Sequence, residues 1–151
     1  MHYLRSLILA LASSVFALAL APAQAEEPAH PVEHKVVYHM NGPDLAYQKA
    51  FLNNIQNHIN AIGTDKMDAV VVMHGEGLDL LKNAKTDEQL KARIDNLKLQ
   101  GVHFNVCNNT LVGRKIDMEK DLYDVKPSDI VPSGVAELAK LQLKGYAYIH
   151  P

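Results

Sequence analysis

The segment Met67–Met73, with the sequence MDAVVVM, constrains the fold of this chain more than any other. It is a continuous apolar run with three consecutive valines near its centre. Such a run is typical of a strand that is covered on both faces, and strands of this kind occur in parallel sheets with helices packed against each side. The segment therefore predicts an α/β fold with a largely parallel sheet.

Helical and extended patterns alternate around this segment. Leu45–Ile62 repeats apolar residues at three- and four-residue steps, follows a capping residue, Asp44, and ends at Gly63. Further helices are expected at 78–82, 87–99, 108–114 and 135–143, with Thr86 capping the second of these. Further strands are expected at 35–39, 102–107, 130–131 and 146–149, whereas 117–127 is charged and shows no clear period. The order predicts one three-layer α/β/α domain over residues 35–151, with a mostly parallel five-stranded sheet and flavodoxin-like architecture.

The N-terminal residues have the pattern of a secretory signal peptide. A short start with a positive charge precedes an apolar run at 7–21, and the small-residue pattern Ala-Gln-Ala follows at 23–25. The alternative is an uncleaved membrane anchor, but the run is shorter than the ~20 apolar residues that such a helix needs. We expect cleavage after residue 25, export to the periplasm without further membrane association, and a flexible lead-in at residues 26–34.

Composition excludes some classes of function. The chain has 15 Lys and Arg against 17 Asp and Glu, a net charge of −2, and no basic stripe, so nucleic-acid binding is not expected. The single cysteine, Cys107, excludes a disulfide within the chain and a metal cage of several thiolates. An exported protein that keeps one thiol either buries it as an inert group or retains it for chemistry.

Cys107 lies where a strand is expected to end and a short helix to begin. The free N–H groups and the positive end of a helix dipole favour the thiolate there, which makes the cysteine a better nucleophile. The alternative is that Cys107 is a small buried residue that closes the strand, because free cysteine is among the most buried residue types. The local pattern leaves both readings open.

Ligands of open parallel sheets bind at the carboxyl ends of the strands. The residues expected at that edge include Cys107 and five candidate pocket residues, His39, Asn41, His74, Asn109 and Thr110. Two histidines and a cysteine also form a known ligand set for copper or zinc, but no local spacing connects His39, His74 and Cys107. We therefore expect polar residues lining a pocket, without a metal or other cofactor, and keep the soft-metal site as the alternative.

Five sequence blocks resemble the exported branch of the DsrE/DsrF-like family. They are KVVYHMN at 35–41, VMHGEGLDLL at 72–81, GVHFNVCNNTL at 101–111, VPSGVAEL at 131–138 and GYAYIHP at 145–151. Together they cover nearly all of the chain after the signal sequence, in order, and the third and fourth blocks are the most specific in combination. The resemblance implies a three-layer fold related to sulfur-relay and sulfur-oxidation proteins. These relatives form trimers or hexamers and carry sulfur as a persulfide on a cysteine after the third strand.

Cys107 matches that cysteine by its place in the third block. The resemblance therefore implies a periplasmic sulfur carrier or sulfurtransferase-like protein, in which Cys107 accepts, carries or binds sulfane sulfur or a small sulfur compound. The five candidate pocket residues would then shape the site and stabilise the thiolate through hydrogen bonds. The implied partners are a small sulfur compound, a sulfur donor or acceptor protein, and further copies of the chain. The competing hypotheses are a non-enzymatic module for a small ligand or soft metal, and a structural domain with a buried cysteine.

Overall fold

The computed structural model describes residues 34–151, so the expected signal peptide and nearly all of the expected lead-in lie outside the described residues. Five parallel strands form one sheet in the order β4-β3-β2-β1-β5. The strands are β1 (His34–Met40), β2 (Met67–Met73), β3 (His103–Cys107), β4 (Ile130–Val131) and β5 (Ala147–Ile149). The expected α/β fold with a parallel five-stranded sheet is confirmed. The strand order was not predicted, and it places β5 beside β1.

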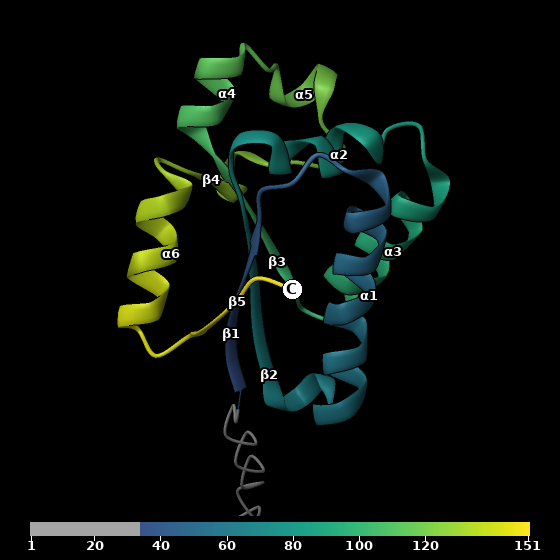
Figure 1. Cartoon of the computed structure of the whole chain (residues 1–151), viewed down its shortest axis with the longest axis vertical. Coiled ribbons are helices and arrows are strands. Elements are labelled where there is room, and N and C mark those ends of the chain that lie inside the picture. The colour runs from purple at the N-terminus through teal and green to yellow at the C-terminus, as the bar shows by residue number, and fades with distance from the viewer. Residues whose placement is uncertain (1–33) are drawn as a thin grey trace, which may run out of the picture.

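Helices cover both faces of this sheet. They are α1 (Leu45–Ile62), α2 (Asp79–Asn83), α3 (Glu88–Leu99), α4 (Asn108–Arg114), α5 (Met118–Asp121) and α6 (Gly134–Leu143). Figure 1 shows α1 and α3 on one side of the sheet and α6 alone on the other, with α4 and α5 above the carboxyl ends of the strands. None of the helices between residues 34 and 151 combines the length and the apolar character that crossing a bilayer requires.

The two faces of β2 explain its unbroken apolar sequence. Val71 and Met73 lie in the larger core, which includes residues of α1 and α3. Val70 and Val72 lie in a smaller core with Leu138 and Leu141 of α6. Side chains alternate between the faces of a strand, so a strand covered on both sides has no position that faces water.

Side-chain caps define where several helices begin. The Asp44 carboxylate accepts a hydrogen bond from the Tyr47 backbone N–H at 2.7 Å and caps α1, as expected. The expected Thr86 cap was wrong, because Asp87 accepts from the first turn of α3 instead. Its carboxylate is a stronger acceptor than a hydroxyl and also complements the positive end of the helix dipole.

Four short helical segments were not predicted, among them the 3-10 turns Thr64–Lys66 and Pro127–Asp129. A 3-10 turn, Gly75–Leu78, precedes α2, and the four-residue α5 lies in the charged stretch that shows no period. The Asp117 carboxylate caps α5 by accepting from two backbone N–H groups, at 3.0 and 3.1 Å. Segments this short complete about one helical turn, so they contain too few residues to reveal a 3.6-residue period.

Candidate functional site

Three of the expected site residues lie on adjacent strands at the carboxyl edge of the sheet and face α6. They are Cys107 at the end of β3, His74 directly after β2, and His39 near the end of β1. Their neighbours in the chain, Met40, Met73 and Val106, belong to the larger core on the opposite face. The alternation of side chains therefore directs all three site residues toward α6.

Gly134, the first residue of α6, packs directly against two of them. A Cβ atom at this position would lie 2.9 Å from the Cβ of His74 and 3.3 Å from the Cβ of Cys107. Only glycine fits there without displacing one of the two side chains. The start of α6 thus joins Cys107 and His74 into one site. The sequence did not predict this contact, although Ser133 and Gly134 stand where the helix begins.

Polar groups around Cys107 lower the pKa of its thiol. The side chain is buried, with 4% of the residue exposed, and burial alone raises the pKa of the thiol. Interactions of the thiol with the Thr110 side chain and with the backbone of Gly134, Thr110 and Asn109 outweigh burial and hold the pKa below its ordinary value. Two of the candidate pocket residues, Asn109 and Thr110, therefore act on Cys107 directly.

The Thr110 hydroxyl is oriented by the loop after β2. The Gly75 backbone N–H donates to Thr110 Oγ1 at 2.9 Å, which leaves the hydroxyl proton free to point at Cys107. Arg114 holds this loop, because its guanidinium donates to the Gly75 carbonyl and to an Asp79 carboxylate oxygen, each at 2.8 Å. Gly75 has a φ of +56°, in the left-handed region that favours glycine.

A chain of hydrogen bonds links His74, after β2, to β5 at the border of the sheet. His74 Nε2 lies 2.6 Å from His39 Nε2, and His39 Nδ1 lies 2.7 Å from the Tyr148 hydroxyl of β5. Burial, followed by the nearby His74 and His150, lowers the pKa of His39 to about 4, and burial also lowers the pKa of His74. Both imidazoles are therefore neutral near pH 7.

Asn41 lies at the β1 and β5 end of this edge. Its Oδ1 lies 3.0 Å from His150 Nε2, so its contact is with the residue that follows β5 rather than with Cys107. The Tyr47 ring lies nearby, with its centroid 6.4 Å from that of His150. Its hydroxyl is the only buried side-chain polar atom without a hydrogen-bond partner among the described residues.

The sequence matches the model of the DsrE/DsrF-like family over residues 12–151. The chain belongs to this family. A protein of unknown function from Methanobacterium thermoautotrophicum is 29% identical, with a TM-score of 0.67, over 78% of this chain and 99% of that one. The ychN protein from E. coli is 17% identical, with a TM-score of 0.57 over 78% of this chain and 97% of that one, and shares the fold. No curated protein sequence matches the chain.

The alternative of a metal centre receives no support from the geometry of this DsrE/DsrF-like protein. Between residues 34 and 151, no three His, Cys, Asp or Glu side chains are grouped as a metal ion would require. The nitrogen atoms of His39 form hydrogen bonds with His74 and Tyr148 instead. The histidines and Cys107 are thus neighbours at one edge without converging on a common point.

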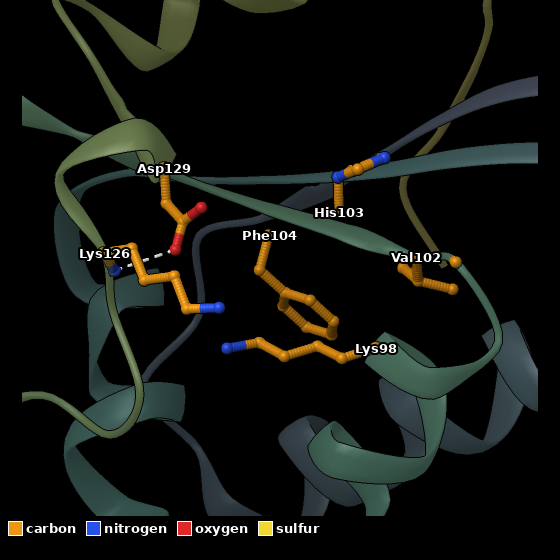
Figure 2. Close-up of a pocket in the computed structure, with 7 residues that line it drawn as sticks. Lys98, Val102, His103, Phe104, Lys126 and Asp129 are labelled. Carbon is orange, nitrogen blue, oxygen red and sulfur yellow. Dashed lines mark hydrogen bonds between the residues drawn. The ribbon is translucent and has the colours of Figure 1, made fainter.

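A pocket of 180 Å³ lies at the other end of β3 (Figure 2). Its walls include the Phe104 ring and the side chains of Lys98 and Lys126, whose ammonium groups point toward each other in Figure 2. His103, the first residue of β3, also lines it, whereas Cys107 is the last residue of that strand. The pocket is therefore separate from the candidate site.

Proposed function

We propose that this DsrE/DsrF-like protein is a sulfur-handling protein of the periplasm, in which Cys107 accepts sulfane sulfur and passes it on. The observation that carries this proposal is the place of Cys107 at the end of β3 and directly before α4, with a thiol pKa that the surrounding polar groups lower. The lowered pKa increases the share of thiolate even though the side chain is buried, and the thiolate is the nucleophilic form of cysteine. Membership of the DsrE/DsrF-like family supports the same chemistry, and the signal-peptide pattern supports the location.

The proposed uptake step is a transfer of sulfur from a persulfide, R–S–SH. The Cys107 thiolate attacks the outer sulfur, a bond forms between Sγ and that sulfur, and the S–S bond of the donor breaks. The electron pair of the broken bond leaves with R–S⁻, and the product is Cys107–S–SH. Release is a second transfer of the same kind, in which the thiolate of an acceptor attacks the outer sulfur of Cys107–S–SH and Cys107 leaves as the thiolate. No external oxidant or reductant is consumed in either direction.

The burial of Cys107 selects among donors. With 4% of the residue exposed, the sulfur is accessible to a small sulfur compound such as a polysulfide but not to a bulky group. A small inorganic or organic sulfane compound is therefore the donor class that this site fits best.

Assembly into a homo-oligomer, a trimer or hexamer as the family resemblance implies, belongs to the same proposal. The exposed face of α6 carries Val135 and Leu143, which are 63% and 90% exposed. Helix α4 adds Val112, which is 70% exposed. Apolar side chains of this kind beside the site offer contacts to further copies of the chain.

Mass spectrometry of the intact protein after exposure to polysulfide tests the proposed function. We expect the wild type to gain mass in steps of one sulfur atom and the Cys107→Ser variant to gain none. Because Cys107 is the only cysteine, the variant removes every thiol from the chain, so an adduct on the wild type is assigned without further mapping. Equal adducts on both proteins, or none on either, would contradict the proposal.

A further inference from the structure

The hydrogen-bonded groups Tyr148, His39 and His74, here called the proton path, cross three adjacent strand ends. The two links measure 2.7 Å from Tyr148 to His39 and 2.6 Å between the two histidines. Both ring nitrogens of His39 are used, so a neutral His39 donates through one and accepts through the other. If one proton shifts along each link, the proton path exchanges one set of neutral tautomers for the other. The net effect is to carry a proton from one end to the other.

Both ends of the proton path are accessible. Tyr148 is 46% exposed and exchanges protons with solvent. At the other end, His74 Nδ1 has no hydrogen-bond partner among residues 34–151. This nitrogen is not fully buried. Among residues 34–151, the Tyr47 hydroxyl is the only fully buried side-chain polar atom without a hydrogen-bond partner, so His74 Nδ1 does not belong to that class.

The His74 end lies beside the reactive sulfur. Gly134 contacts the side chains of both His74 and Cys107, and no side chain on Gly134 separates them. The outer sulfur of a persulfide on Cys107 extends one S–S bond, about 2 Å, beyond Sγ. Among the described residues, His74 is the titratable side chain that shares the contact at Gly134 with Cys107.

Sulfur release needs a proton at this position. A deprotonated persulfide, Cys107–S–S⁻, repels an attacking thiolate, whereas its protonated form is a good electrophile. We propose that His74 donates a proton to the outer sulfur of the Cys107 persulfide, and that His39 and Tyr148 replace this proton from solvent. This inference rests on the proposed function of Cys107 and assigns the proton path to sulfur release rather than uptake.

The proton balance of release is closed. The Nδ1–H of His74 moves to the outer sulfur, the Nε2–H of His39 moves to His74, and the Tyr148 hydroxyl proton moves to His39, while water reprotonates Tyr148. An acceptor thiolate R′–S⁻ then attacks the outer sulfur, which forms R′–S–SH and leaves Cys107 as a thiolate. His74 is the catalytic residue in this scheme, and His39 and Tyr148 are positioning residues that act through it.

The surroundings of the proton path keep it neutral, as this relay requires. His150 lies 5.1 Å from His39 between ring centroids, and together with burial it disfavours a charged imidazole there. A charged histidine would carry protons on both nitrogens and interrupt the transfer. Tyr47 of α1 lies against the same end and carries no charge at neutral pH.

The test compares sulfur uptake with sulfur release in Tyr148→Phe, which removes only the hydroxyl that links the proton path to solvent. Tyr146→Phe is the matched control, because Tyr146 bonds to Asp68 and lies outside the proton path. Each protein is loaded with polysulfide, freed of excess reagent and mixed with 2-mercaptoethanol, and loss of the persulfide is followed by mass spectrometry. We expect equal loading of all proteins and release slower by about tenfold or more in Tyr148→Phe alone. A solvent deuterium isotope effect on release is expected in the wild type and in Tyr146→Phe.

The outcomes separate the two proposals. Equal release rates for the two tyrosine variants, with equal loading, would overturn the proton path and leave the proposed function intact. A wild type that gains no sulfur would overturn the proposed function and the proton path with it. His39→Gln interrupts the proton path at its centre and provides a second variant, for which release at least as slow as in Tyr148→Phe is expected.

Discussion

Replacing Gly77 with alanine is expected to destabilise the protein by about 3 kcal/mol or more. A Cβ atom on Gly77 would lie 2.0 Å from the carbonyl oxygen of Met40 and 2.5 Å from its carbonyl carbon. These are backbone atoms at the end of β1, which cannot rotate aside as a flexible side chain does. The loop after β2 would have to separate from β1, and the contact between His39 and His74 would be lost with it.

Thermal unfolding measures this effect, and Gly113→Ala provides the matched control. A loss of about 3 kcal/mol lowers the Tm of a domain of this size by roughly 10 °C. No heavy atom lies within 4 Å of a Cβ placed on Gly113, which is inside α4. Alanine there should leave the Tm unchanged or raise it slightly, because glycine is a poor helix former. Equal Tm values for the Gly77 variant and the wild type would show that the loop does not pack against β1 in this way.

Acidification from pH 7 to pH 4 is expected to destabilise the protein through His39. The pKa of His39 is about 4 in the folded protein and near 6.5 in the unfolded chain, so between these values the unfolded chain binds more protons. Its contribution to stability is therefore complete above pH 6.5 and is lost as the pH falls toward 4. The loss approaches about 1.4 kcal/mol per pH unit and reaches at most about 3 kcal/mol in total. The lowered pKa of His74 acts in the same direction.

Urea unfolding at several pH values between 7 and 4 measures this dependence. His39→Gln removes the titrating group and should flatten the pH dependence of the free energy of unfolding, even if the variant is less stable at pH 7. His103→Gln, which replaces an exposed imidazole in the same way, is the matched control. A His39 variant with an unchanged slope would show that other groups cause the loss.

Much of the fold was predictable because its signals are local. The apolar run of β2 and the three- and four-residue steps of α1 predicted both elements with their observed bounds. The sequence did not show that Asp87 rather than Thr86 caps α3. The cap is the side chain that accepts from two backbone N–H groups of the first turn, and this depends on the local geometry. The strand order was missed for a different reason, since it depends on which way each connection crosses the sheet.

For the candidate site, the residues at the strand ends were predictable, but the contacts that depend on the strand order were not. The rule for strand ends placed His39, His74 and Cys107 at one edge, and the structure brings the two histidines into contact. The same rule could not predict that Tyr148 bonds to His39, because that contact requires β5 to pair with β1. Gly134 was missed because its role depends on α6 crossing to the opposite face of the sheet from the other long helices.

The pKa of the Cys107 thiol decides whether the proposed sulfur chemistry can begin, because the uptake step starts from the Cys107 thiolate. The rate of alkylation by iodoacetamide, followed against pH, reports this pKa in the folded protein. We predict a midpoint below the ordinary value for cysteine, and a higher midpoint in Thr110→Val, which lacks the hydroxyl. A wild-type midpoint at or above that value, unchanged in Thr110→Val, would contradict the account.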